Sequence, residues 1–290
     1  MRIAGAPISW GVCEVPDWGV QLAPDRVLAE MRELGMTATE FGPQGWLPEE
    51  PARRSGVLSE AGLQAVGAFV PVVLHDPGHD PVPGVAAELE AFEAAGGDTL
   101  VLAAATGADG YDERPELTEA QWRTLLANLD RVAELARSRG IRPTLHPHVG
   151  TLIERRDEVL RVLDGSSMPI CLDTGHLLIG GTDPAWLAET YADRIAHVHA
   201  KDVSAALAEQ VRSGELTYTE AVRQGIYVPL GAGDVDVAAI VAALDGVGYD
   251  GWYVLEQDTI LAAEPAAGTG PVEDVRASLA FLRSLSDRRA

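Results

Sequence analysis

Acidic and histidine side chains stand directly after four short apolar runs in the second half of the chain. Asp173 follows one such run, His199 ends another, and His146 and Glu256 follow two more. These residue types are common metal ligands and common acid or base groups. A single histidine in such a place is more often a structural residue than a ligand. Because four strand-like runs end in the same way, the pattern predicts one shared site.

The segment 195–202, Ile-Ala-His-Val-His-Ala-Lys-Asp, indicates how such a site can be built. Side chains alternate between the two faces of a β-strand, so His197, His199 and Lys201 share one face. Two imidazoles and an ammonium group would then lie on the same surface. We therefore expect this strand to contribute several polar groups to the site.

Eight strand-like segments alternate with helix-like segments along the 290 residues. This order predicts an α/β fold, a single (β/α)8 TIM barrel that occupies residues 1–290 as one domain. The expected strands are 2–10, 37–41, 64–74, 99–105, 141–146, 170–173, 195–199 and 251–256. The helical segment 118–139 begins with a capping-box pattern. In such a barrel the carboxyl ends of all strands meet on one rim, which is where the site is expected.

The segment 203–228 interrupts this alternation after the seventh strand. It contains two helical stretches, around 205–211 and 217–224. Long connections on the carboxyl rim of a barrel are typically lids or contacts between subunits. We therefore expect a helical insertion beside the site. The insertion is also compatible with a homo-oligomer.

Composition and charge exclude some partners. The chain has 44 acidic and 22 basic residues and a formal net charge of −22, so its average surface repels phosphate backbones and anionic lipids. No apolar run reaches the roughly 18 residues of a membrane span. The two cysteines, Cys13 and Cys171, lie far apart in the sequence and fit reduced thiols. We therefore expect a cytoplasmic protein that binds neither nucleic acid nor membranes.

The predicted metal ligands are His146, Asp173, His199 and Glu256. A mixed set of nitrogen and oxygen donors suits Mn²⁺ or Co²⁺, is compatible with Zn²⁺, and suits Mg²⁺ less well. Four protein ligands leave two positions of an octahedral ion free to chelate a hydroxy-ketone. His148 is an alternative ligand or a substrate contact. We prefer His146 because it ends the apolar run directly.

A chelated hydroxy-ketone loses an adjacent C–H proton more readily, and the ion stabilises the resulting enediolate. Reprotonation then gives isomerisation or epimerisation, whereas loss of a β-hydroxyl gives dehydration. Candidate acid or base groups that could also contact the substrate are Lys201, His176 and Glu40, and Glu256 is a further catalytic candidate. Each of the first three has a structural alternative: an ion pair of Lys201 with Asp202, a turn hydrogen bond for His176, and a solvated position for Glu40.

Two tryptophans follow the first two expected strands. Trp10 and Trp46 could form an apolar wall against a sugar or cyclitol ring. Simple packing at the barrel mouth is the alternative for both. We include them among the candidate substrate-binding residues.

Three motifs resemble the xylose-isomerase-like TIM-barrel superfamily of sugar isomerases, epimerases and apurinic-site endonucleases. They are Leu-Asp-Thr-Gly-His at 172–176, His-Val-His-Ala-Lys-Asp at 197–202 and Val-Leu-Glu-Gln at 254–257. Within that superfamily, His-Pro-His-Val-Gly-Thr at 146–151 and the insertion segments 219–222 and 225–229 resemble the inosose dehydratases (2-keto-myo-inositol dehydratases). The resemblance implies a Mn²⁺- or Co²⁺-assisted loss of water from a keto-cyclitol, with the four predicted ligands in the metal positions.

The resemblance also ranks the alternatives. The epimerases of this superfamily carry a fifth-strand glutamate that is both ligand and base, and His146 replaces it here, which weakens an isomerase or 3-epimerase function. The additional metal ligands of the endonucleases have no counterpart in this sequence. The turn 229–234, Pro-Leu-Gly-Ala-Gly-Asp, departs from the Pro-Gly-Asp-Gly of the dehydratases and leaves the substrate open. We predict a carbon-oxygen lyase of carbohydrate or inositol catabolism, with a non-catalytic sugar-binding barrel as a second alternative.

Overall fold

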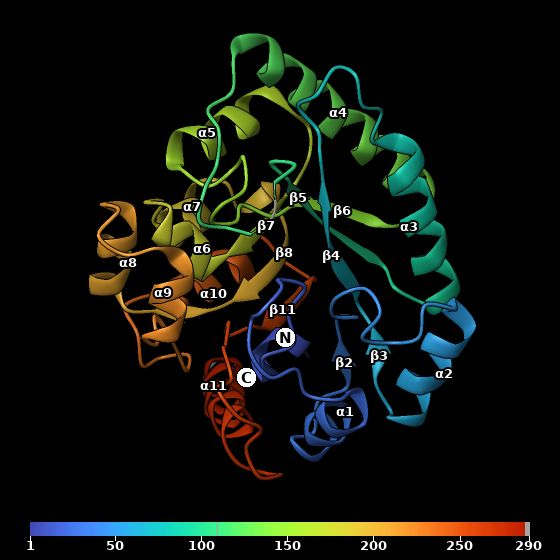
Figure 1. Cartoon of the computed structure of the whole chain (residues 1–290), viewed down its shortest axis with the longest axis vertical. Coiled ribbons are helices and arrows are strands. Elements are labelled where there is room, and N and C mark those ends of the chain that lie inside the picture. Colours follow the sequence, from blue (N-terminus) through green and yellow to red (C-terminus); the bar gives the residue numbers. More distant parts are fainter. Residues whose placement is uncertain (109, 288–290) are drawn as a thin grey trace.

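The computed structural model describes residues 1–108 and 110–287. Nine parallel strands form one sheet in the order β3-β2-β1-β11-β8-β7-β6-β5-β4, with helices around its outside (Figure 1). The strands are β1 (Arg2–Gly5), β2 (Ala38–Thr39), β3 (Gln64–Ala65), β4 (Gly67–Val72), β5 (Thr99–Ala104), β6 (Arg142–Leu145), β7 (Ile170–Asp173), β8 (Ile195–Ala200) and β11 (Trp252–Leu255).

The sheet closes on itself because β3 and β4 are one barrel strand interrupted at Val66. β3 pairs with β2, while β4 pairs with β5. Val66 itself donates its N–H to Thr39 and accepts from the N–H of Thr99, so it is bonded to both neighbouring strands. Counting β3 and β4 together, the nine strands make eight barrel positions. The prediction of a (β/α)8 barrel is confirmed.

The described residues also contain eleven α-helices and two short 3-10 helices. The α-helices are α1 (Pro24–Glu33), α2 (Pro51–Glu60), α3 (Val82–Ala95), α4 (Glu119–Ser138), α5 (Arg156–Gly165), α6 (Thr174–Ile179), α7 (Pro184–Thr190), α8 (Ala205–Arg212), α9 (Tyr218–Arg223), α10 (Val237–Gly246) and α11 (Pro271–Asp287); the 3-10 helices are η1 (Pro7–Trp10) and η2 (Ala192–Arg194). The predicted capping box of α4 is confirmed, since Thr118 and Gln121 each bond the backbone N–H of the other. None of the described helices is long and apolar enough to span a bilayer.

Two apolar clusters hold the barrel together. The larger one fills the space between the strands and the surrounding helices, and β5 is buried along its whole length there, as expected for a parallel strand covered on both faces. The smaller cluster consists of inward-facing side chains inside the barrel: Ala4, Ala6, Ala38, Val66, Trp252 and Val254. This inner cluster forms an apolar floor below the polar ends of the strands.

The first expected strand, 2–10, is too long. β1 ends at Gly5, and the chain turns into η1. Pro7 has no N–H to donate to a neighbouring strand and favours the first turn of a helix. Gly11, with φ at 79°, then ends η1 in the left-handed region. The strand is therefore short, and residues 7–10 belong to the rim.

Helix α6 was not predicted from the sequence. It begins directly after Asp173, whose Oδ1 accepts from the backbone N–H groups of Gly175 at 3.0 Å and His176 at 2.7 Å. Its six residues are too few to show helical periodicity, so only this cap marks it.

The helical insertion after the seventh strand is confirmed. It contains α8 and α9, and its two ends pair as the antiparallel strands β9 (Asp202–Val203) and β10 (Tyr227–Val228). The sequence did not predict this pairing. It returns the chain to the barrel rim close to where it left.

Candidate active site

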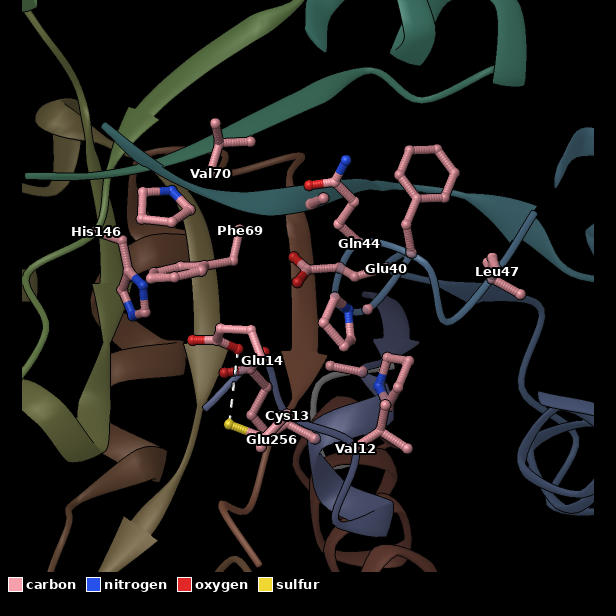
Figure 2. Close-up of a pocket in the computed structure, with 18 of the residues that line it drawn as sticks. Val12, Cys13, Glu14, Glu40, Gln44, Leu47, Phe69, Val70, His146 and Glu256 are labelled. Carbon is pink, nitrogen blue, oxygen red and sulfur yellow. Dashed lines mark hydrogen bonds between the residues drawn. The ribbon is translucent and has the colours of Figure 1, made fainter. Parts of the chain in front are cut away.

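A cavity of about 500 Å³ opens at the carboxyl ends of the barrel strands. Figure 2 shows Glu40, His146 and Glu256 approaching it from different strands, with Phe69 between them. The predicted site residues that line it are Glu40, His146, His148, His199, Lys201 and Glu256. Asp173 and His176 lie behind this lining, buried against it. The structure therefore brings together all but two of the predicted side chains.

Asp173 stands at the centre of the cluster. While its Oδ1 caps α6, its Oδ2 lies 3.0 Å from His146 Nε2 and 3.2 Å from Lys201 Nζ. One carboxylate oxygen thus holds the helix and the other faces the site. Burial acts to raise the pKa of Asp173, but the charge of Lys201 holds it well below its usual range.

His199 and Glu256 complete a set of converging donors. His199 Nδ1 lies 3.0 Å from Glu256 Oε2 and 3.6 Å from Asp173 Oδ2, yet it makes no hydrogen bond to either. The ligand atoms of Asp173, His199 and Glu256 all lie within 4.8 Å of one another. Donor atoms that point at a common position rather than at each other fit a metal ion.

His146 and His148 occupy different parts of the site. His148 Nδ1 lies 2.7 Å from the carbonyl of Val149, and its ring stacks on that of His176 with the centroids 3.7 Å apart. His146 instead points its Nε2 at Asp173. Burial lowers the pKa of His146, which favours the neutral imidazole that binds metals. The geometry thus favours His146 over His148 as the fourth ligand.

Glu40 is held by two imidazoles. Its Oε1 lies 2.9 Å from His197 Nε2 and 3.0 Å from His199 Nε2. If both rings donate these protons, His199 Nδ1 keeps a free lone pair for a metal. Burial acts to raise the pKa of Glu40, but the two histidines hold it far below its usual range. The solvated position considered for Glu40 is wrong, because its side chain is almost fully buried.

Lys201 is the ammonium group of the site. Its Nζ lies 3.2 Å from Asp173 Oδ2, 3.1 Å from Glu256 Oε2 and 2.8 Å from Asp258 Oδ1. Burial acts to lower the pKa of Lys201, but these carboxylates raise it well above its usual range. Three buried carboxylates that share one ammonium leave an excess of negative charge. A divalent cation would compensate this excess.

Asp202 accepts hydrogen bonds from the backbone and makes no ion pair with Lys201. Its Oδ2 accepts from the N–H groups of Gly231 at 2.8 Å and Gly233 at 3.0 Å, and its Oδ1 accepts from Val235 at 3.0 Å. A Cβ on Gly233 would lie 2.2 Å from Asp202 Oδ1, so this position needs a glycine. The ion pair between Lys201 and Asp202, considered from the sequence, is wrong.

Trp10 and Trp46 are the two predicted residues that lie outside the cluster around the cavity. Trp10 Nε1 donates to Glu30 Oε2 at 2.8 Å, and Trp46 Nε1 donates to the carbonyl of Leu22 at 2.9 Å. Both indoles are therefore turned toward α1 and the loop before it. The aromatic lining comes instead from side chains that the sequence did not single out: Trp18, Phe41, Phe69, Phe92, Tyr111 and Tyr218.

Two further polar residues belong to the site and were missed. Asp258 stands two residues after Glu256, so strand alternation could have indicated that it shares the same face. It contacts Lys201 and lines the cavity. Tyr218 reaches the cavity from α9 of the insertion. No local pattern predicts that approach.

Comparison with known proteins extends this description. Residues 28–285 match the family described as xylose isomerase-like TIM barrel. The chain belongs to this family. It is 32% identical over 275 residues to the inosose dehydratase of Geobacillus kaustophilus (strain HTA426), an alignment that covers 89% of this chain and 87% of the relative. This relationship indicates that the xylose isomerase-like barrel described here is an enzyme.

Solved structures share the barrel at lower identity. An L-ribulose 3-epimerase is 19% identical with a TM-score of 0.69, and the match covers 99% of this chain and 96% of that one. A structure of the IolI protein with a zinc atom bound is 14% identical with a TM-score of 0.70, and the match covers 99% of both chains. These likenesses support the fold.

Proposed function

We propose that this protein is a divalent-metal-dependent lyase that removes water from a keto-cyclitol or keto-sugar, as its inosose dehydratase relatives are named for doing. The observation that carries the proposal is the convergence of His146, Asp173, His199 and Glu256 at one cavity. A small polyol suits a cavity of about 500 Å³ whose lining combines polar groups with aromatic rings.

The four side chains would hold the ion through two imidazole nitrogens and two carboxylates. This donor set suits Mn²⁺ or Co²⁺ and is compatible with Zn²⁺, the metal in the IolI structure. Bound there, the ion would polarise the substrate carbonyl and lower the pKa of the neighbouring C–H group. Two carboxylates would also offset the charge of a divalent cation.

The remaining side chains have roles that follow from their contacts. Lys201 reaches the cavity and donates to His176 Nε2 at 3.0 Å, so these two groups can move a proton at the substrate. Glu40 orients His199 through Nε2, which favours a positioning role over acid-base work. Glu256 lies beside Lys201, and its carboxylate stays a catalytic candidate as well as a ligand.

A ketose isomerase or 3-epimerase is the second candidate, because L-ribulose 3-epimerase shares the fold. An epimerase needs a proton acceptor on each face of the reacting carbon. His146 points its Nε2 at Asp173 in the ligand cluster and is therefore poorly placed for that task. The site thus favours loss of water over inversion.

Metal analysis followed by turnover tests the proposal. The purified protein is expected to hold about one ion per chain and, with Mn²⁺ or Co²⁺ restored, to convert scyllo-inosose into an ultraviolet-absorbing dione. New stereoisomers of a ketose without a dione would favour the epimerase. Sugar binding that survives removal of the metal, without turnover, would favour a non-catalytic barrel.

A further inference from the structure

Five side chains form a closed ring of contacts on the side of the cavity next to the insertion. Lys201 Nζ lies 2.8 Å from Asp258 Oδ1 and 3.0 Å from His176 Nε2. Asp258 Oδ2 accepts from the Tyr218 hydroxyl at 2.5 Å. The Tyr218 and Tyr227 hydroxyls lie 3.0 Å apart, and Tyr227 lies 3.4 Å from His176 Nδ1. All five side chains are buried, so the ring is shielded from bulk water.

The contacts of His176 assign its tautomer. Lys201 carries only donors, so His176 Nε2 accepts from it, and the neutral ring keeps its proton on Nδ1. The backbone N–H of Val149 also lies 3.4 Å from Nδ1. The Lys201 contact is shorter and therefore decides the assignment.

This tautomer fixes which group donates and which accepts in each remaining hydrogen bond of the ring. His176 donates from Nδ1 to Tyr227, Tyr227 donates to Tyr218, and Tyr218 donates to Asp258. Each tyrosine hydroxyl then donates once and accepts once. A chain of this kind can pass a proton from one end to the other without moving any heavy atom.

The ring reaches the cavity at Tyr218. Both Tyr218 and its acceptor Asp258 line the cavity, whereas Tyr227 and His176 lie behind them. Tyr218 begins α9, and the next residue, Thr219, holds this helix in place through its N–H and hydroxyl, which lie 3.1 and 3.2 Å from Asp112 Oδ1. The insertion thus places a phenol at the cavity, beside Asp258.

We propose that Tyr218 is the general acid of the dehydration, an inference that rests on the proposed lyase function. As the C–O bond breaks, the departing oxygen takes the bonding electrons and the Tyr218 proton, and it leaves as water. Tyr227 then reprotonates Tyr218, and His176 Nδ1 reprotonates Tyr227. The proton lost from the neighbouring carbon, whose C–H electrons form the new C=C bond, re-enters the ring through Lys201 and His176 Nε2. The number of protons in the ring is unchanged after each turnover, and His176 carries its proton on Nε2 until it returns to the Nδ1 tautomer.

The surroundings of Tyr218 suit this role. Burial and the charge of Asp258 raise the pKa of Tyr218 well above its usual range, so the phenol stays protonated at neutral pH. Its hydroxyl hydrogen can rotate from Asp258 toward a substrate oxygen. Asp258 keeps its contact with Lys201 during that rotation.

Tyr218→Phe tests the proposal, because it removes one hydroxyl and retains the ring. With scyllo-inosose as substrate, kcat is expected to fall by about 10²- to 10⁴-fold, with KM and metal content close to those of the wild type. Tyr191→Phe is the matched control, since Tyr191 packs on Trp186 outside the cavity. It should leave kcat unchanged.

A substrate analogue with fluoride in place of the departing hydroxyl separates acid catalysis from a structural role. Fluoride leaves without first taking a proton, so Tyr218→Phe should process this analogue at close to the wild-type rate. The variant should also still exchange the α-hydrogen in D₂O, because removal of that proton precedes loss of the leaving group.

Undiminished dehydration of scyllo-inosose by Tyr218→Phe would overturn the proposal. An equal loss of rate with both leaving groups would also overturn it, because it would reveal a structural effect. If the metal-loaded wild type eliminates neither water from scyllo-inosose nor fluoride from the analogue, the proposed function fails, and the assignment of Tyr218 fails with it.

Discussion

The rim and the floor of the barrel interior are built from the same strands but carry opposite chemistry. On β11, Trp252 and Val254 belong to the apolar floor, and Glu256, two residues further on the same face, lines the cavity. The floor residues Ala4 on β1 and Ala6 just after it are small. A two-residue step along a strand therefore separates a packing position from one that lines the cavity.

Stability and function depend on different parts of the barrel interior. Buried charges at the rim cost free energy unless each has a partner, and three carboxylates there share Lys201. The floor and the helix layer bury apolar surface, which stabilises the fold. Substitutions at the rim should therefore change ion binding and turnover, and substitutions at the floor should change the free energy of unfolding.

Asp173→Asn should have the largest effect. The amide oxygen can still cap α6, so the fold is retained, but the charged ligand is lost. We expect metal content to fall to background, and activity to fall by more than the roughly 100-fold typical of losing an outer-shell partner. Elemental analysis and turnover measure this. Asp157→Asn, at an exposed position of α5, is the control. A full complement of metal in Asp173→Asn would contradict the assigned site.

Glu40→Gln should weaken metal binding without removing the ligands. The amide oxygen can still accept from His197 and His199, but it carries no net charge, so both hydrogen bonds weaken and the His199 ring is held less firmly. The dissociation constant for Mn²⁺ should rise by about 10- to 100-fold, measured by titration calorimetry. Glu60→Gln, an exposed change on α2, should leave it unchanged. An unaltered Mn²⁺ affinity in Glu40→Gln, with activity lost, would instead favour direct acid-base work by Glu40.

Val254→Ala at the floor should act on stability alone. The side chain is fully buried, so its truncation leaves a cavity and should lower the free energy of unfolding by about 2 kcal/mol. Urea denaturation measures this. Val247→Ala, at a side chain that is 55% exposed, should change it by less than about 0.5 kcal/mol. A change in metal content in Val254→Ala would show that rim and floor are not independent.

Trp10→Phe should have the smallest effect on the chemistry. The substitution removes the hydrogen bond to Glu30 and should cost about 1–2 kcal/mol of stability. Because the indole does not line the cavity, KM for scyllo-inosose should stay the same. A raised KM in a protein of unchanged stability would instead indicate that Trp10 contacts the substrate.

Most of the barrel was predictable from local patterns. Apolar runs alternating with helical segments gave the order of elements, and β7 matches its expected range of 170–173. Glycine, proline and the capping box at Thr118 marked several boundaries. The exceptions were η1 and α6, both too short for periodicity to appear, and the pairing of β9 with β10, which joins the two ends of a long insertion.

The sequence by itself determined the fold class, which follows from the alternation of strand-like and helix-like segments. It also determined which strand ends carry ligand-type residues, because those residues directly follow the apolar runs. Tertiary structure alone decided which of those residues meet. It placed Glu40 against His197 and His199 across a sequence separation of more than 150 residues, turned Trp10 toward Glu30, and brought Tyr218 from the insertion to Asp258. Such contacts depend on barrel closure and on how a loop folds back over the rim, and neither leaves a periodic signal in the chain.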